Sequence, residues 1–141
     1  MENMPLMRSI RLTSKTWARW LRRIAAEAGI PDSYRPVLMF LSRCPGSSQK
    51  ELAEELMVSG AAVSQIVRDM QREDYLYREP CPGDQRQTAL YLTQRGLDAA
   101  DCLRRALHEA DAVITSAVTP EKEAQITDFL EDLRNLIEKE L

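Results

Sequence analysis

The sequence has little of several residue types on which enzymatic function depends. It contains one histidine, three cysteines and five glycines among 141 residues. A single histidine leaves few options for acid–base catalysis, and the sequence holds no catalytic triad set, phosphate-binding glycine loop or metal-ligand spacing. Cys44, Cys81 and Cys102 are odd in number and widely spaced, which argues against a disulfide scaffold or a zinc site. We therefore expect no enzyme, no metal and no cofactor.

Long apolar runs are missing as well. No stretch approaches the roughly 18 apolar residues of a membrane-spanning helix, and the first 15 residues lack the apolar core of a signal peptide. These absences predict a cytoplasmic protein with no membrane partner. The content of 44% apolar and 29% charged residues is typical of one globular domain or one protomer of a small oligomer.

The charge is unevenly distributed along the chain. The net charge of −3 argues mildly against nucleic acid as a partner. Residues 1–43, however, carry eight basic and three acidic side chains, whereas residues 96–141 carry five basic and eleven acidic ones. Local basic surfaces can therefore exist outside the acidic last third.

Helical signals dominate the sequence. Apolar residues recur three, four or seven positions apart over most of the chain. Ser48 and Glu51 have the spacing of a reciprocal capping box, and Thr93 and Thr119 stand where they can cap two long C-terminal helices. The expected helices cover about residues 6–28, 33–41, 49–56, 60–72, 94–116 and 120–141.

A β-hairpin is expected between the fourth and fifth helices. Tyr75–Glu79 and Thr88–Leu92 are rich in β-forming residues, and the intervening residues 80–87 are rich in turn formers. The order helix, helix, capped helix, turn, helix, hairpin predicts a mainly α winged helix-turn-helix with a two-stranded β-wing. We expect residues 30–92 to form this domain, flanked by N- and C-terminal dimerisation helices in residues 1–29 and 93–141.

The spacing within the two-helix unit supports this prediction. Apolar residues and one small residue, Ala53, stand where two helices that cross over a short turn must pack. One departure is Met57, which occupies a turn position where glycine is frequent, so the turn must form without glycine. The apolar residues are Leu52, Leu56, Val58, Val63 and Ile66.

The wing carries the most specific motif. Residues 84–96 fit the pattern D-x-R-x-x-x-L-x-L-T-x-x-G at every defined position, and residues 51–56 read ELAEEL. On these residues the chain resembles the MarR (multiple antibiotic resistance regulator) family of winged-helix transcription factors. Asp74 stands where such proteins usually have glycine, and we expect it to end the helix in a left-handed conformation, which aspartate tolerates.

The shape of the fold predicts which side chains contact DNA. A helix enters the major groove with its first residues near the base edges. Gln65 can read adenine, Arg68 can read guanine or hold phosphate, and serines suit phosphate. In the proteins that this chain resembles, the arginine equivalent to Arg86 enters the minor groove, and Asp84 is expected to orient it. The predicted contacts are Ser59, Gly60, Ala61, Ser64, Gln65, Arg68, Arg86, Arg78 and Lys50, with Arg95 as a further phosphate partner.

The terminal helices predict a homodimer. Ile126, Phe129, Leu130, Leu133 and Ile137 form a near-heptad apolar stripe on the last helix. The alternative is that this stripe packs against the chain's own long helix. A two-fold dimer would present two recognition helices to half-sites of a palindromic operator about one turn apart.

The resemblance also implies a small effector, commonly phenolic or anionic. Trp17, Trp20, Tyr34 and Met39 can line a pocket for it, although the same residues can equally belong to the core. The leading interpretation is a ligand-responsive repressor that binds double-stranded DNA. Two alternatives remain: a protein-docking module that binds no DNA, and a redox-sensing regulator that uses Cys81.

Overall fold

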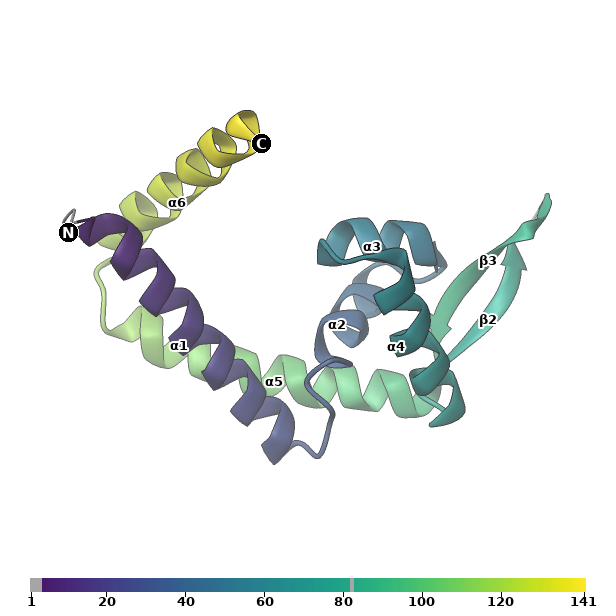
Figure 1. Cartoon of the computed structure of the whole chain (residues 1–141). Coiled ribbons are helices and arrows are strands. Elements are labelled where there is room, and N and C mark those ends of the chain that lie inside the picture. The colour runs from purple at the N-terminus through teal and green to yellow at the C-terminus, as the bar shows by residue number, and fades with distance from the viewer. Residues whose placement is uncertain (1–3, 82) are drawn as a thin grey trace. The chain divides into compact units, whose positions relative to one another are not determined.

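The structure is a computed structural model that describes residues 4–81 and 83–141 (Figure 1). It confirms a mainly helical fold with a small antiparallel sheet. The helical bounds agree with the sequence-based prediction to within about two residues. The helices are α1 (Pro5–Glu27), α2 (Arg35–Arg43), α3 (Gln49–Leu56), α4 (Gly60–Arg72), α5 (Gln94–Ser116) and α6 (Pro120–Glu140), and the strands are β1 (Ser47–Ser48), β2 (Leu76–Cys81) and β3 (Asp84–Leu92).

The chain forms two compact units. The first extends to Arg105 and contains the helix-turn-helix, the sheet, α1 and the first half of α5; the second is Ala106–Leu141. The predicted division into a DNA-binding domain and a dimerisation region concerns function, so it stays a prediction. Structurally, α1 and the start of α5 belong to the same unit as the winged helix.

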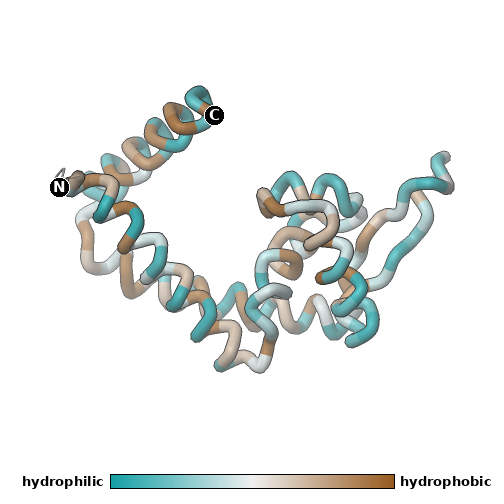
Figure 2. Tube along the Cα trace, viewed as in Figure 1, coloured by the Kyte–Doolittle hydropathy of each residue, from teal (hydrophilic) through white to brown (hydrophobic). Residues whose placement is uncertain are grey.

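The core of the first unit lies beneath the helix-turn-helix. The apolar faces of α2 and α4 are fully buried there, and Figure 2 shows apolar residues on the inner sides of these helices. Leu52 of α3, Leu90 of β3 and Leu103 of α5 complete the core. Because α4 uses this face for packing, its opposite face remains open to solvent. The fully buried residues of α2 and α4 are Val37, Leu38, Leu41, Val63, Val67 and Met70.

Four side-chain hydroxyls cap helices, and three of them, Ser48, Thr93 and Thr119, were predicted. Ser48 accepts a hydrogen bond from the amide of Glu51 at 3.1 Å, and Thr119 accepts one from the amide of Lys122 at 3.3 Å. The fourth cap is Ser59 at the start of α4, which accepts from the amide of Ala62. The expected return bond from the Glu51 side chain is not among the hydrogen bonds of the described residues, so only half of the capping box forms.

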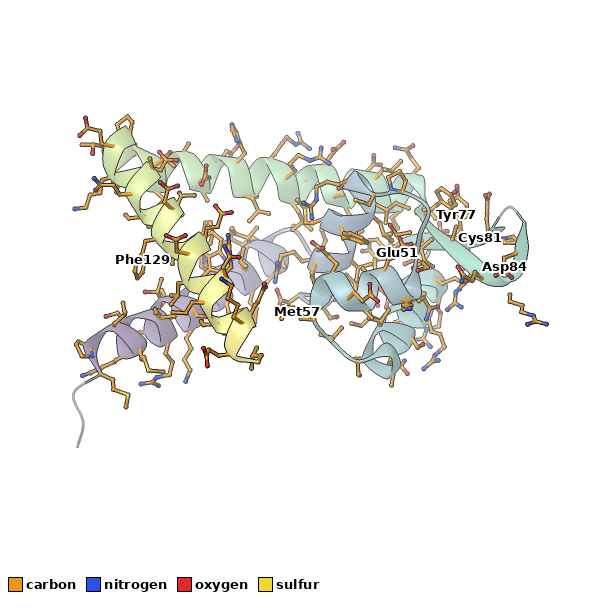
Figure 3. All side chains as sticks on the ribbon, turned by 90° about the horizontal axis from the view of Figure 1, so that it is seen from above. Glu51, Met57, Tyr77, Cys81, Asp84 and Phe129 are labelled. Atoms are coloured by element: carbon orange, nitrogen blue, oxygen red, sulfur yellow. The ribbon has the colours of Figure 1, made fainter. Side chains whose placement is uncertain are left out.

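Two residues other than glycine take the left-handed conformation. Met57 ends α3 with φ of 54°, and Asp74 follows α4 with φ of 63°. The turn between α3 and α4 thus forms without glycine, as expected, and Asp74 has the predicted conformation. Met57 has 85% of its surface exposed, so its side chain meets no steric obstacle there (Figure 3).

The sheet differs from the predicted two-stranded wing. Its strand order is β1-β3-β2, because the short strand Ser47–Ser48 pairs with Leu90 and Ala89 of β3. Two serines carry no β-forming signal, which explains why the sequence did not indicate this strand.

The two wing strands are also longer than predicted. They continue to Cys81 and begin again at Asp84, where a loop over residues 80–87 was expected. A register shift between Pro80 and Cys81 accommodates the turn-forming residues. Proline is tolerated because β2 is an edge strand and needs no amide donor on its free side. Pro82 lies outside the described residues.

A close junction joins the wing to α5. The Thr93 hydroxyl donates a hydrogen bond to the carbonyl of Asp74 and accepts one from the amide of Gly96. The amide of Thr93 donates to the carbonyl of Tyr75. A Cβ on Gly96 would lie 2.1 Å from that same carbonyl oxygen. Residue 96 must therefore be glycine for α5 to approach the start of β2 this closely.

A polar cluster completes this junction. Tyr34, the residue before α2, is buried. Its hydroxyl donates a hydrogen bond to Glu73 at 2.8 Å, and its ring packs edge-on against the Tyr75 ring. The pKa of Tyr34 is raised to about 12, mainly because burial disfavours the charged tyrosinate and secondly because of the hydrogen bond to Glu73. The Arg95 guanidinium lies 4.3 Å from the Tyr75 ring centre and donates to the carbonyl of Glu73. The cluster thereby ties α2, the end of α4 and α5 together.

We predict that Gly96→Ala destabilises the protein by about 1–3 kcal/mol, because the added Cβ must displace the backbone of Tyr75. Urea unfolding measures the change. Gly60→Ala is the matched control, since nothing lies within 4 Å of its added Cβ. A Gly96→Ala protein as stable as the Gly60→Ala protein would contradict this account of the junction.

We predict that Tyr34→Phe costs about 1 kcal/mol at neutral pH, because Glu73 loses its donor. The folded pKa is above the unfolded value of 10.0, so this stabilisation is complete below pH 10 and is lost as the pH rises through about 12. Ultraviolet titration of the wild type should show a tyrosinate that forms only near pH 12.

The variant should lack that tyrosinate. Tyr77→Phe serves as the control, since Tyr77 is exposed and its hydroxyl makes no hydrogen bond to the described residues. A wild-type titration without a phase near pH 12 would refute the role of the Tyr34–Glu73 contact.

Candidate nucleic-acid interface

The solvent face of α4 carries the polar side chains that the sequence singled out. Gly60, Ala61, Gln65 and Arg68 are exposed, and Ser64 is half-buried. They lie on the face opposite Val63, Val67 and Met70, which are buried. The amphipathic pattern of α4 therefore presents one continuous polar surface that begins at the amino end of the helix.

Two serine hydroxyls near the amino end of α4 each accept one hydrogen bond. Ser59 Oγ accepts the amide of Ala62 at 3.2 Å, and Ser64 Oγ accepts from Gln49 Nε2 at 3.0 Å. In both serines the acceptor is used and the hydroxyl proton remains available, which is the group that a phosphate oxygen requires. Gln49 was not among the predicted site residues, although it opens the helix-turn-helix unit.

Hydrogen bonds to neighbouring side chains on α4 orient Gln65. Arg68 donates to Gln65 Oε1 at 2.9 Å, and Gln65 Nε2 donates to Asp69 Oδ1 at 3.0 Å. Arg72 also pairs with Asp69. The amide of Gln65 therefore has a defined orientation, and it retains one N–H and one acceptor lone pair for an adenine edge. Asp69, which is not among the predicted site residues, holds the donor side of this amide.

The wing places Arg86 in solvent beside its predicted partner. Asp84 accepts a hydrogen bond from the backbone amide of Arg86 at 2.9 Å. No ion pair joins the two side chains among the described residues. The carboxylate thus shapes the backbone near the wing tip, where Figure 3 places Asp84, and leaves the arginine side chain free of that acid.

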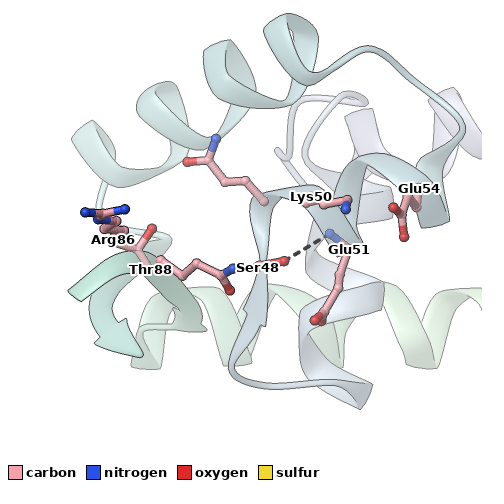
Figure 4. A pocket seen from close by; sticks show the side chains of 8 residues that line it. Ser48, Lys50, Glu51, Glu54, Arg86 and Thr88 are labelled. Carbon is pink, nitrogen blue, oxygen red and sulfur yellow. Dashed lines mark hydrogen bonds between the residues drawn. The ribbon is translucent and has the colours of Figure 1, made fainter. Parts of the chain in front are cut away.

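A cleft of about 480 Å³ lies between the start of α3 and β3 (Figure 4). Lys50 lines it from α3 and Arg86 from β3, so the structure brings together two predicted cations that are 36 positions apart. Glu51 and Glu54 also line it and reduce its positive potential. The remaining lining residues, which the sequence analysis did not identify, are Ser48, Gln49, Gln87 and Thr88.

Arg78 and Arg95 differ in how available their guanidinium groups are for a phosphate contact. Arg78 is half-buried on β2, and its Nε is enclosed without a hydrogen-bond partner. Arg95 is engaged by the Tyr75 ring, the Glu73 carbonyl and the Tyr75 hydroxyl. Its guanidinium therefore supports the junction, and no sequence signal distinguished this role from phosphate binding.

The four residues suggested for an effector pocket do not meet around one cavity. Trp17 is 47% exposed and packs at 4.8 Å against the half-buried Trp20 on α1. Tyr34 belongs to the buried cluster with Glu73, and Met39 is half-buried on α2. The three described cavities, at the wing, between α3 and α4, and along α1, are lined by none of the four.

Cysteine and metal chemistry receive no support from the geometry. Cys44, Cys81 and Cys102 are all free thiols, and Cys81 is half-buried near the end of β2 (Figure 3). In the described ranges, no three potential metal-ligating side chains come together. Within those same ranges, no helix has the length and apolarity needed to cross a bilayer.

Comparison with known proteins finds similarity to one family. Residues 28–87 match the model of the MarR family. A candidate transcriptional regulatory protein for the hcr operon, from Thauera aromatica, is 21% identical over 82% of this chain and 69% of its own length.

Solved structures share the fold over nearly the whole chain. A MarR transcriptional regulator from Methanosarcina mazei has a TM-score of 0.80 at 20% identity, covering 96% of this chain and 98% of that one. The MepR–DNA complex from S. aureus has a TM-score of 0.83 at 19% identity, covering 96% and 99%. MarR from E. coli has a TM-score of 0.76 at 21% identity, covering 94% and 98%.

These relatives are regulators rather than enzymes, in agreement with the expectation that the chain is no enzyme. The family match covers the helix-turn-helix and most of the wing, the segment that carries the polar face of α4 and Arg86. The chain therefore matches the MarR family model over residues 28–87 and shares the winged helix-turn-helix fold of solved MarR structures.

Proposed function

We propose that the chain is a sequence-specific DNA-binding transcriptional regulator, a repressor that binds a palindromic operator as a homodimer in the cytoplasm. The observation that carries this proposal is the exposed polar face of α4 together with an unpaired Arg86 on the wing. A structural neighbour with the same fold was solved bound to DNA, which supports the assignment of DNA as the partner.

Each side chain of the face has a role in this proposal. Gln65, held by Arg68 and Asp69, reads an adenine edge in the major groove, and Ala61 contacts a thymine methyl. Gly60 lets the backbone approach the duplex, and Ser59 and Ser64 donate to phosphate oxygens. Arg86 enters the minor groove, where narrow A·T-rich DNA concentrates negative potential. Lys50 and Arg78 neutralise phosphates on either side.

The homodimer is supported by apolar surface that the single chain leaves open. No residue of α6 is buried in the chain. Phe129 is 47% exposed and Ile126 is 44% exposed, on the same stripe as Leu130 and Ile137. Burying such residues against a second copy removes this area from water. Sedimentation at micromolar concentration should show a dimer, and a monomer would contradict this part of the proposal.

Ligand response is the remaining part of the proposal. Trp17 and Trp20 form an aromatic pair with one exposed member, which is a suitable contact for a small aromatic or anionic effector. Since the four suggested residues line none of the described cavities, such a pocket would have to be completed by a second copy.

The function is tested by selection from random-sequence DNA at two salt concentrations. We expect an enriched inverted repeat whose half-sites lie about one helical turn apart, and an affinity that falls steeply with salt because phosphate contacts release counterions. No enrichment and no dependence on salt would instead indicate a protein-docking module.

We predict that Arg86→Ala weakens binding to the selected operator and lowers the slope of log affinity against log salt by about 1, as expected when one phosphate-neutralising cation is lost. Fluorescence anisotropy across a salt titration measures both quantities. Arg104→Ala is the matched control, because Arg104 pairs with Asp101 on α5 and lies outside the interface. Equal slopes for the two variants would remove Arg86 from the contacts.

A further inference from the structure

Asp69 is an acidic residue on α4 for which the proposed DNA contacts provide no partner. It follows Arg68 directly and stands one turn after Gln65, so a negative charge lies beside two proposed DNA contacts. Such a charge is unfavourable next to a polyanion. Its side chain is 28% exposed, compared with 59% for Asp101, which forms an ion pair of the same spacing on α5. An acid in this place therefore requires a specific explanation.

The Asp69 carboxylate is held from one side and holds a neighbour on the other. Its Oδ1 accepts hydrogen bonds from the Arg72 guanidinium and, at 3.0 Å, from Gln65 Nε2. The arginine stands three positions after Asp69 and the glutamine four positions before it, so all three lie along one side of α4. The ion pair with Arg72 fixes the carboxylate, and the carboxylate in turn fixes the NH2 group of Gln65.

The other end of the Gln65 amide meets a group of opposite chemistry. Arg68 donates to Gln65 Oε1 at 2.9 Å. A carboxylate can only accept hydrogen bonds and a guanidinium can only donate them. A half-turn about the Cγ–Cδ bond of Gln65 would set oxygen against oxygen at Asp69 and N–H against N–H at Arg68. The terminal torsion of a glutamine is otherwise roughly two-fold, so these two neighbours select one of its two orientations.

A similar contact on α5 lacks this selection from both sides. Gln94 Nε2 donates to Asp98 Oδ1 at 2.8 Å, with the same spacing of four positions. Among the hydrogen bonds of the described residues, the Gln94 oxygen has no arginine donor. A glutamine–aspartate pair alone is therefore an ordinary surface contact, and the arginine on the oxygen distinguishes Gln65.

The orientation of the amide determines which base pair it matches. In the major groove an A·T pair presents the adenine N7 acceptor and then the N6 donor, and a T·A pair presents these groups in the reverse order. A glutamine donates to N7 and accepts from N6. With its NH2 group on the side of Asp69, Gln65 matches an adenine whose N7 lies on that side. An amide free to turn would match adenine on either strand.

We propose that Asp69, acting through Gln65, determines which strand of one base pair in each half-site carries adenine. Asp69 is a positioning residue for specificity and makes no contact with DNA itself. The inference rests on the proposed function, because it requires α4 to lie in the major groove. Loss of the carboxylate releases the amide, so the effect is on the choice between A·T and T·A rather than on binding in general.

The test compares the affinities for two kinds of duplex by fluorescence anisotropy. One is the selected operator, and in the others a single A·T pair of each half-site is replaced by T·A, one position at a time. Gln65→Ala identifies the position that Gln65 reads, because discrimination should be lost there alone. At this position we expect the wild type to prefer A·T by about tenfold or more, the scale of one bidentate base contact.

Asp69→Asn should reduce this preference to about twofold or less, because asparagine offers the amide both a donor and an acceptor and so supports either orientation. Asp69→Glu, which keeps a group that only accepts, should retain the preference. An unchanged preference in Asp69→Asn would overturn the proposal, and so would a loss in Asp69→Glu as large as that in Asp69→Asn. Circular dichroism establishes that each variant keeps its helices.

A second variant tests the other side of the amide. Arg68→Met removes the donor to Gln65 Oε1 and should relax the same preference at the same position. The salt dependence of binding separates the two variants. Asp69→Asn should keep the wild-type slope, because Asp69 neutralises no phosphate, and any gain in affinity from its lost charge is shared by both duplexes. An Arg68→Met protein with the full wild-type preference would contradict the proposal.

The matched control is Asp98→Asn, which removes one negative charge and one glutamine–aspartate hydrogen bond on α5. It should keep the wild-type preference, and if it loses the preference equally, charge is responsible and the proposal fails. A wild type without salt-dependent DNA binding would refute the proposed function itself. A wild type that selects an operator but keeps its preference in Asp69→Asn would retain that function and refute only the role of Asp69.

Discussion

The contact between Gly96 and the carbonyl of Tyr75 is the constraint on which the rest of the winged helix depends. The carbonyl oxygen lies 2.1 Å from the place where a Cβ would stand. Asp74, in the left-handed conformation, separates this carbonyl from the end of α4. Thr93 bonds to both sides of the junction. As a result, the end of α4, the base of the wing and the start of α5 are held together.

This arrangement couples the start of α5 to the wing. Any displacement of the start of α5 must move Tyr75 and Thr93, and with them the base of both wing strands. The Tyr34–Glu73 hydrogen bond and the Arg95–Tyr75 stacking link the same point to α2. A displacement of the start of α5 would therefore be felt at α2, at the end of α4 and at the wing together.

Charge acts locally in this protein. The net charge of −3 disfavours a polyanion as partner, yet exposed Lys50 of α3, Arg68 of α4 and Arg86 of the wing place basic groups locally, with acidic side chains among them. At physiological salt, screening limits the reach of an exposed charge to about 8 Å. The arrangement of neighbouring side chains consequently matters more than the total.

Several features followed from sequence because they depend on near neighbours. The caps at Ser48 and Thr119, the left-handed Asp74 and the start of α4 at Gly60 are local, and each was predicted from residues within one turn. The third strand and the extended wing were missed, because pairing across β3 supplies hydrogen bonds that Ser47, Ser48 and Pro80 do not signal. For the site, the sequence predicted the polar residues that are exposed on α4 and expected Asp84 to orient Arg86; the structure shows Asp84 accepting a hydrogen bond from the Arg86 backbone amide.

The sequence by itself determined the order and ends of the helices and a resemblance to a family, since these depend on periodicity, capping and a short motif in the wing. Only the tertiary structure decided which polar groups are free to bind a partner. Arg95 and Tyr34 looked available, yet they are engaged by Tyr75 and Glu73 from other elements. Lys50 and Arg86 face one cleft although they are far apart in sequence. Such outcomes depend on contacts between distant segments, and no local propensity encodes them.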